Sequence, residues 1–236
     1  MDFYRAHGMD VTYVGNPLVD LVDYEGIRDV APVPHRIGLM PGSRRKEVDS
    51  LMPAFAGAAD LLVKTFPDLE FHCVRASNFS EEYLRSLWNV DAPLVMHDGS
   101  DRYRLMRTFQ CIMAASGTAT LETGLAGVPT LVAYKVSPLS YQIALRVIKV
   151  KWISLTNLIM NRTVFPEHIE KEADPAPMAR RVEDWLTHPQ KLEEIIRDLD
   201  ELRERCGSRG SALRAAEALA GELFPPLAER EDACRC

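Results

Sequence analysis

The sequence of 236 residues has no apolar run close to the roughly 20 residues that a helix needs to span a bilayer, and no signal peptide is visible. It also lacks an excess of positive charge, because its net charge is −6. A protein that neutralises many phosphates of a nucleic acid needs a basic surface, so nucleic-acid binding is not expected. These absences predict a cytoplasmic protein.

Cysteine and histidine are few, and their spacing does not suit a metal site. The five cysteines are an odd number in a chain without a secretory signal, which fits a reducing cytoplasm. Cys73 and Cys111 lie in apolar runs and are expected to be buried thiols. Cys234 and Cys236 are one residue apart with no histidine nearby, which makes a weak metal site. The six histidines show no ligand spacing, so no metal and no cofactor is predicted.

What is present is an ordinary globular composition, with 47% hydrophobic and 26% charged residues. The length permits one large domain, or one domain plus fragments of a second. Apolar runs predict strands at 36–40, 70–74, 93–96, 111–114 and 130–133. Helical patterns lie between and after them, at 45–65, 80–88, 101–108, 118–126 and 138–148. This alternation predicts an α/β fold with a Rossmann-like parallel sheet and helices on both faces.

The segments on either side of this pattern are less regular. Residues 1–8 are typical of the end of a helix, 11–14 of a strand, and 23–35 of a linker. From 176 to about 223 the chain is amphipathic and helical, with stops at Pro189 and Gly207, and 228–236 is expected to be frayed. The predicted division is therefore an irregular N-terminal segment with a linker at 1–30, an α/β domain with closing helices at 31–225, and a tail at 226–236.

The stretch 150–172 places Asn157, Asn161, Arg162 and Glu167 among large apolar residues. No helix is expected to begin well there, and so apolar a loop should be packed against something. Loops of this length without regular structure are often functional, although a structural crossover loop would give the same pattern.

The segment 115–122 (ASGTATLE) is the most informative part of the chain. It follows a predicted buried strand and opens a helical pattern that stops at 127–129 (GVP). The first N–H groups of a helix lack internal partners and the helix dipole adds partial positive charge, so this turn predicts a phosphate site. The carboxylate of Glu122, one turn into the helix, could accept hydrogen bonds from sugar hydroxyls. An ordinary helix cap is the alternative interpretation.

A second junction of this kind follows the apolar run 36–40, where 41–47 (PGSRRKE) leads into a helix. Gly42 lets the backbone approach a ligand closely, Ser43 is a plausible helix cap, and the forked guanidinium of Arg44 suits a phosphate. Cations in the first turn of a helix oppose its dipole, so the three basic residues at 44–46 indicate that an anion binds at this turn. A solvated basic turn is the alternative. Two such junctions can lie side by side at the carboxyl ends of an open parallel sheet, where these folds bind ligands.

Four segments together resemble the lipid-A-disaccharide synthase family. They are 13–17 (YVGNP), 41–48 (PGSRRKEV), 115–149 (ASGTATLETGLAGVPTLVAYKVSPLSYQIALRVIK) and 152–167 (WISLTNLIMNRTVFPE). They occur in the family's order and spacing over nearly all of 10–225, and this combination is highly specific. The resemblance implies that the chain holds the C-terminal lobe of a GT-B glycosyltransferase, a class of enzyme built from two Rossmann-like lobes. In that case 31–225 is the UDP-sugar-binding lobe, and 1–30 is a remnant of the N-terminal lobe with a linker.

The resemblance implies an enzyme of lipid A biosynthesis in Gram-negative bacteria. Such an enzyme transfers 2,3-diacylglucosamine from its UDP donor to 2,3-diacylglucosamine 1-phosphate, releases UDP and needs no metal. Protein groups must then stabilise the charge on the leaving UDP, which helix N-termini and an arginine can do. By the same resemblance we expect the N-terminal lobe, which brings the acceptor site, the catalytic base and a membrane-facing apolar patch, to be missing. A partner lobe, a possible homodimer and peripheral contact with the inner membrane follow from the same resemblance.

Carried over residue by residue, the resemblance also implies a donor site. At the donor's phosphates it places Gly42, Ser43 and Arg44, with Arg44 stabilising the leaving group. It assigns the helix-terminus anion site to Ser116, Gly117, Thr118 and Thr120, and the ribose to Glu122. On the sugar side of the cleft it places Asn157, Arg162 and Glu167, with Tyr134 and Lys135 nearby. The resemblance places the uracil on backbone groups of the loop around Asp98 and Gly99.

One position departs from the family's pattern. The family often has a glutamine a few residues after 166–167 (PE), where this chain has Glu170. An acid near a pyrophosphate would repel it unless the side chain points away or pairs with Lys171.

Two further functions stay open beside the transferase. One is a nucleotide-sugar-binding module without catalysis, such as a split subunit. The other is another UDP-sugar enzyme of this architecture, for instance an epimerase, which the 154–162 stretch (SLTNLIMNR) disfavours. An orphaned lobe should expose an apolar patch around 1–22 and along the final helices, where the missing lobe would dock. The apolar residues Leu18, Val19, Leu21 and Val22 favour such a lobe.

Overall fold

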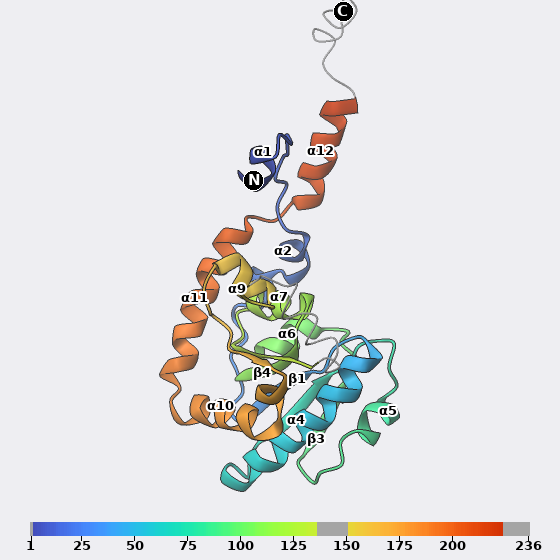
Figure 1. Ribbon diagram of the computed structural model, residues 1–236, viewed down its shortest axis with the longest axis vertical. Helices are drawn as coiled ribbons and strands as arrows, with labels where there is room; N and C mark the ends of the chain where they lie inside the picture. Colours follow the sequence, from blue (N-terminus) through green and yellow to red (C-terminus); the bar gives the residue numbers. More distant parts are fainter. Residues whose placement is uncertain (1, 136–150, 224–236) are drawn as a thin grey trace, which may run out of the picture. The chain divides into compact units, whose positions relative to one another are not determined.

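The computed structural model describes residues 2–135 and 151–223 (Figure 1). The helix predicted at 138–148 and the tail predicted at 228–236, including Cys234 and Cys236, lie outside the described residues. Contacts within the chain form two compact units. One is Val22–Arg205, and the other combines the described parts of Met1–Leu21 and Cys206–Cys236. The division at residues 30 and 225 stays a prediction.

The centre of the larger unit is a six-stranded sheet in which all neighbouring strands are parallel. Its strands are β1 (Arg36–Met40), β2 (Glu70–Val74), β3 (Leu94–His97), β4 (Cys111–Ala115), β5 (Thr130–Tyr134) and β6 (Glu167–Ile169). The order β3-β2-β1-β4-β5-β6 makes β1 and β4 neighbours, with Met40 opposite Ala114. The predicted parallel sheet is confirmed, and the two motif-bearing strands lie side by side.

Helices cover both faces of the sheet because successive strand residues point to opposite sides. Leu39, Met113 and Leu131 belong to the core shared with α4 (Arg45–Thr65) and α10 (Pro175–Thr187), and α5 (Glu81–Ser86) adds Leu84 to it. Ile112 and Val132 are equally buried and lie outside that core. The opposite face carries α6 (Arg102–Arg107), α7 (Thr118–Leu125) and α9 (Leu155–Met160) (Figure 1). The helix α11 (Gln190–Cys206) contributes Leu192 to the first core and places Leu199 and Leu202 beside Gly124 of α7.

The helix boundaries follow local capping chemistry. Ser80 caps α5 by accepting a hydrogen bond from the N–H of Tyr83, and Ser154 caps α9 by accepting one from Asn157. The predicted stops are confirmed, because α10 ends two residues before Pro189 and α11 ends at Cys206, immediately before Gly207. In the smaller unit, Asp20 accepts hydrogen bonds from both the N–H and the hydroxyl of Ser211, where α12 (Ser211–Leu223) begins.

Three local predictions were wrong. Residues 11–14 form no strand. Instead, the Val14 carbonyl accepts a hydrogen bond from the Arg214 guanidinium at 2.9 Å. The linker at 23–35 contains the short helix α3 (Tyr24–Ile27), which follows α2 (Pro17–Val22). The expected loop at 150–172 holds α9, β6 and the 3₁₀ turn η1 (Glu170–Ala173), because Ser154 caps α9 and three residues suffice to extend a parallel sheet. The N-terminal helix predicted at 1–8 is α1 (Asp2–Ala6).

Two histidines are stacked inside the sheet near its β3 edge. His72 on β2 is 4% exposed, and its Nδ1 lies 3.0 Å from Nε2 of His97 on β3. The two rings are stacked with centroids 5.2 Å apart, and the ring of Phe109 lies 5.5 Å from that of His72. Burial favours the uncharged imidazole and lowers the pKa of both histidines.

We therefore expect the free energy of unfolding to fall in mild acid. Below about pH 6.5 the imidazoles of the unfolded chain take up protons, whereas those of the folded chain stay uncharged until the pH reaches their lowered pKa values. The free energy of unfolding is therefore highest above about pH 6.5 and declines as the pH falls from there to the lowered pKa values. The buried imidazole of His72 contributes up to about 1.4 kcal/mol per pH unit in this range, and the half-buried His97 contributes less. In urea unfolding between about pH 7.5 and pH 5.5, His72→Gln should flatten this dependence, whereas His35→Asn, on an exposed loop, should not. Equal slopes in both variants and the wild type would contradict the expectation.

Candidate functional site

A cleft of about 690 Å³ opens at the carboxyl ends of the strands, across the boundary between β1 and β4. This is the point where the strand order reverses, which is where open α/β sheets bind ligands. The lining comes from the ends of four strands and the residues after them, at 40–44, 74–78, 98–102 and 115–119, and from the start of α9. Of the predicted site residues, Gly42, Ser43, Arg44, Ser116, Gly117, Thr118 and Glu122 line it.

The α7 side of the cleft offers free backbone donors. Within the described part of the chain, no backbone hydrogen bond uses the N–H groups of Gly117, Thr118 or Ala119. Ser116 is different, since its N–H donates to the Ala133 carbonyl at 3.0 Å and its hydroxyl donates to the Ile153 carbonyl at 3.0 Å. Three consecutive N–H groups at a helix N-terminus can therefore receive an anion, whereas the donors of Ser116 are used to hold the turn.

The α4 side is shaped by Gly42 and by an exposed ion pair. Gly42 has φ of +108°, and a Cβ there would lie 2.6 Å from Glu47 Oε2, so only glycine fits this turn. Arg44, not Ser43, is the N-cap of α4, and its guanidinium donates to Glu47 at 2.8 Å while 81% of its side chain is exposed. The guanidinium keeps donors free to reach across the cleft toward an anion.

Glu122 lies in the cleft as predicted from its place on α7. Its side chain is 10% exposed and accepts a hydrogen bond from Arg102 at 3.1 Å. Burial raises the pKa of Glu122, and the charge of Arg102 opposes that rise. Arg102 also lies over the ring of Tyr103, with its guanidinium carbon 4.8 Å from the ring centroid. A carboxylate held in this way can accept hydrogen bonds from ligand hydroxyls.

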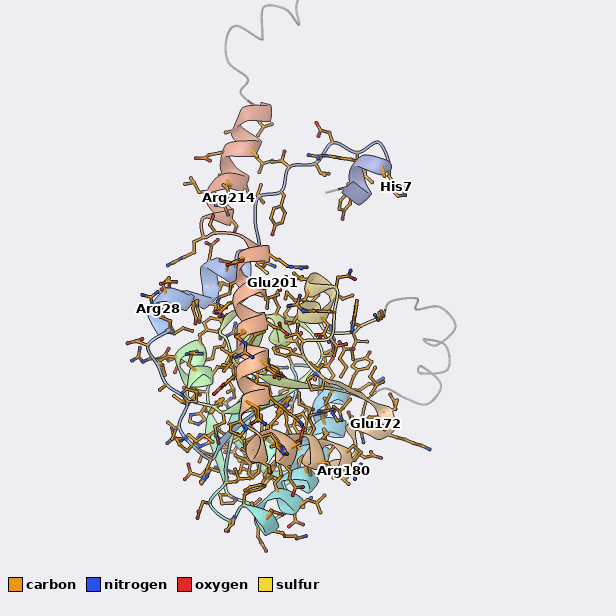
Figure 2. All side chains as sticks on the ribbon, turned by 90° about the vertical axis from the view of Figure 1, so that its left-hand side faces the viewer. His7, Arg28, Glu172, Arg180, Glu201 and Arg214 are labelled. Atoms are coloured by element: carbon orange, nitrogen blue, oxygen red, sulfur yellow. The ribbon has the colours of Figure 1, made fainter. Side chains whose placement is uncertain are left out.

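Two predicted site residues lie away from the cleft because their polar groups bond elsewhere. The hydroxyl of Thr120, a fully buried residue, donates to the Gly117 carbonyl at 2.8 Å, so it steadies the turn and does not face a ligand. Arg162 donates to Asp198 at 2.9 Å and Glu201 at 2.6 Å on α11 (Glu201 is labelled in Figure 2). Hydrogen bonds to these carboxylates raise the pKa of Arg162.

Asn157 and Glu167 are also absent from the lining formed by the described residues. Asn157 is fully buried; its side-chain oxygen accepts from the N–H groups of Val164 and Phe165, and its amide donates to Phe165 and Glu167. Glu167 accepts from the N–H groups of Ile153 and Ser154 at 2.9 Å each. Both side chains are therefore bonded within the protein, which differs from the expected place on the sugar side.

The remaining predicted positions lie around this region. Tyr134 ends β5 and Lys135 follows it, donating to Asp174 at 2.5 Å. Neither residue lines the cleft formed by the described residues. Glu170 begins the 3₁₀ turn η1 with a φ of 54°. The roles of these three residues toward a ligand stay predictions.

Other polar residues that the sequence did not single out also line the cleft, among them Asn78, Arg75 and Arg102. Asn78 donates to the Ser43 carbonyl at 2.9 Å and so holds the Gly42–Ser43 turn. Arg75, the residue after β2, and Arg102, the first of α6, add two more guanidinium groups. The one available signal was position, because Arg75 directly follows a predicted buried strand.

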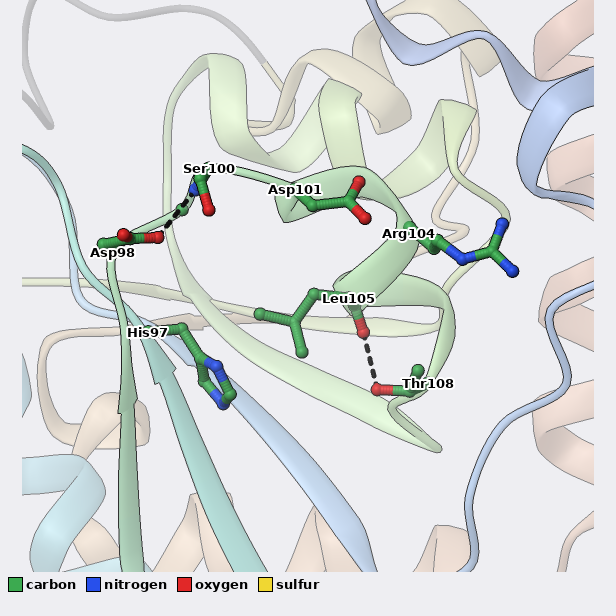
Figure 3. Close-up of a pocket in the computed structure, with 8 residues that line it drawn as sticks. His97, Asp98, Ser100, Asp101, Arg104, Leu105 and Thr108 are labelled. Carbon is green, nitrogen blue, oxygen red and sulfur yellow. Dashed lines mark hydrogen bonds between the residues drawn. The ribbon is translucent and has the colours of Figure 1, made fainter.

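A second cavity of about 360 Å³ lies beside the loop after β3 (Figure 3). Its lining includes His97, Leu105 and Thr108, and it shares Asp98 and Gly99 with the main cleft. Asp98 accepts a hydrogen bond from the N–H of Ser100 at 2.9 Å, which fixes the loop between the two spaces (Figure 3). The uracil position at Asp98 and Gly99 stays a prediction.

Among residues 2–135 and 151–223, no group of three or more histidine, cysteine or acidic side chains could hold a metal ion. In the same residues, no helix combines the length and apolarity needed to cross a membrane. Cys73 and Cys111 are buried thiols, as predicted. Burial raises the pKa of each to about 12, which makes them unreactive.

Taken together, the strand order and the cleft define a Rossmann-like lobe of the GT-B type. Comparison with solved structures agrees on this fold. A Listeria monocytogenes protein assigned as a UDP-N-acetylglucosamine 2-epimerase matches with a TM-score of 0.63 and 16% identity, over 95% of this chain and 57% of that chain. The S. aureus MnaA–UDP co-structure matches with a TM-score of 0.56 and 13% identity, over 89% of this chain and 54% of that chain. The calicheamicin glycosyltransferase CalG4 matches with a TM-score of 0.51 and 15% identity, over 83% of this chain and 45% of that chain.

The chain belongs to the lipid-A-disaccharide synthetase family, whose model matches residues 1–220. A lipid-A-disaccharide synthase from Trichlorobacter lovleyi is 36% identical over 222 residues, covering 91% of this chain and 58% of the relative. The synthase from Syntrophus aciditrophicus is 35% identical over 221 residues, covering 90% and 58%. The resemblance is thus confirmed, and the chain spans about 58% of the length of these curated relatives.

Proposed function

We propose that the chain supplies the donor-binding lobe of a lipid-A-disaccharide synthase. The complete enzyme transfers 2,3-diacylglucosamine from its UDP donor to 2,3-diacylglucosamine 1-phosphate and releases UDP. The observation that carries the proposal is the row of free N–H groups at 117–119, which opens into a cleft that Arg44 also lines. Family membership and the relatives' printed activity support the choice of reaction.

In this proposal the lobe stabilises the leaving group of the reaction. As the sugar–phosphate bond breaks, negative charge grows on the UDP oxygens, and preorganised donors lower the barrier when they point at that charge. The N–H groups of 117–119 and the α7 dipole act from one side, and Arg44 acts from the other. No metal is required in this scheme, because these groups carry the positive charge.

Glu122 fits the ribose in the same proposal. Its carboxylate lies one helical turn beyond the free N–H groups and lines the same cleft. Arg102 holds the carboxylate in place and offsets its charge. The bound UDP of the structurally similar MnaA supports a uridine nucleotide as ligand.

The lobe's partner in this proposal is the part of the family's length that this chain does not span. Exposed apolar side chains lie on the smaller unit: Tyr13 at 57%, Leu21 at 59%, Leu213 at 64%, Leu219 at 62% and Leu223 at 69%. Such side chains are suited to a docking surface. The predicted apolar patch is narrower than expected near the N-terminus, because Leu18 and Val19 are half-buried and Val22 is buried.

Peripheral membrane contact belongs to the same proposal, since both substrates carry acyl chains, and a homodimer is part of it through the family resemblance alone. The catalytic base and the acceptor site are assigned to the part of the family's length that this chain does not span. General-base help is typically worth about 10²–10⁴ in rate, so a chain without the base should turn over very slowly.

The first test is UDP binding and turnover by the complete 236-residue chain. Calorimetry should give a dissociation constant in the micromolar to low-millimolar range, and the chain alone should form no disaccharide from UDP-2,3-diacylglucosamine and its acceptor. Adding the N-terminal portion of a relative should restore product. Robust turnover by the chain alone would overturn the assignment of the catalytic base to the part of the family's length that this chain does not span. A folded chain without UDP affinity would overturn the assignment as a donor-binding lobe.

A further inference from the structure

The anion-facing turn at 116–120 is fastened to the start of α9 by two hydrogen bonds. The Ser116 hydroxyl donates to the Ile153 carbonyl at 3.0 Å, and the Thr156 hydroxyl donates to the Thr120 carbonyl at 2.8 Å. The two helices approach closely at Gly124, where a Cβ would lie 2.9 Å from the Thr156 hydroxyl oxygen. Whatever fixes residues 153–156 therefore also fixes the turn.

Glu167 is the group that fixes them. It stands on the edge strand β6 opposite Val132, and both of its oxygens are used. Oε2 accepts from the Ile153 N–H, and Oε1 accepts from both the Ser154 N–H and the Asn157 amide, each at 2.9 Å. These three bonds hold the backbone of Ile153 and Ser154 and the side chain of Asn157 in place, because hydrogen bonds to an ionised acceptor are about twice as strong as neutral ones.

The geometry points to Glu167 as a positioning residue for phosphate binding. Its carboxylate sets the backbone of Ile153, Ile153 receives the Ser116 hydroxyl, and Ser116 sets the direction of the free N–H groups at 117–119. Glu167 touches no ligand in this arrangement. The inference rests on the proposed function, because it deepens the role of the same cleft, and it replaces a sugar contact for Glu167 with an indirect effect on the phosphates.

The test compares ligands with and without phosphates on the complete chain. Glu167→Gln sets an amide NH₂ against one of the backbone N–H groups and removes the charge. We expect it to weaken UDP binding about tenfold while uridine binding, measured by ligand-observed NMR, stays within about twofold, since only the phosphate donors move. The amide resonances of Gly117, Thr118 and Ala119 should shift in the ligand-free variant. Glu81→Gln, an exposed carboxylate paired with Arg85, is the matched control and should change neither.

Ser116→Ala provides a second route if Glu167→Gln fails to fold. It cuts the link between Ile153 and the turn, so it should reproduce the selective loss of UDP affinity. In the double variant the two losses should not add, because both break the same chain of contacts. Equal losses for UDP and uridine, or no loss for either, would overturn the positioning role. If the wild-type chain binds no UDP, the proposed function fails instead, and the ligand-free amide shifts still decide the role of Glu167.

Discussion

Replacing Arg44 by alanine should weaken UDP binding about 30-fold, which corresponds to about 2 kcal/mol for charge-assisted hydrogen bonds to phosphate. The variant loses the most exposed guanidinium at the cleft and also removes the charge that pairs with Glu47, so an unneutralised carboxylate then faces the ligand's negative charge. Folding should be little affected, because an exposed ion pair contributes at most about 1 kcal/mol. Calorimetry at fixed ionic strength measures the affinity.

Arg45→Ala is the matched control for the charge itself. Arg45 is the next residue, is 74% exposed, lies over the ring of Tyr83 and does not line the cleft. It should change UDP affinity by less than about twofold, because exposed charges at a distance are screened. Arg44→Lys should recover only part of the loss, since an ammonium cannot bind phosphate in bidentate fashion. Equal losses in the two alanine variants would assign the effect to the overall field and not to contact by Arg44.

The sequence predicted the sheet and both strand–turn–helix junctions because the relevant signals are local. An apolar run buried on both faces, followed by a small-residue turn and a helical pattern, indicates one strand and one helix wherever it occurs. Repeating this unit predicts a parallel sheet, and the structure confirms that β1 and β4 are neighbours. The strand β6 was missed because Glu167–Ile169 (EHI) is short and contains only one apolar residue.

The directions of polar side chains could not be predicted, because their partners are far away in the sequence. Arg162 bonds to α11 residues 36 and 39 positions later, and nothing in the local pattern signals that pairing. Glu122 was placed correctly from its helix position, yet its partner Arg102 comes from a different helix. Family resemblance identifies which residues matter without saying which of them face a ligand, and so Asn157 and Glu167 were expected in the cleft.

The burial of Asn157 leads to the largest expected effect on stability. All of its side-chain bonds are made within the protein: two N–H groups donate to its oxygen at 2.8 and 2.9 Å, and its amide donates to Phe165 and Glu167. Asn157→Ala would leave buried N–H groups of Val164 and Phe165 without partners, at a cost of about 3–4 kcal/mol. Asn78→Ala, which removes one exposed side-chain bond to Ser43, should cost less than about 1 kcal/mol. Urea unfolding measures both.

Asn157→Asp separates a structural role from a ligand contact. Its oxygens can still accept from Val164 and Phe165, but it can no longer donate, and it faces the Glu167 carboxylate where the amide now lies 2.9 Å away. Two carboxylates this close raise the pKa of one of them, so this variant should be strongly destabilised at neutral pH and regain stability as the pH falls and the pair takes up a proton. A side chain that served the sugar alone would behave differently: Asn157→Ala would unfold like the wild type and lose only affinity for the sugar nucleotide.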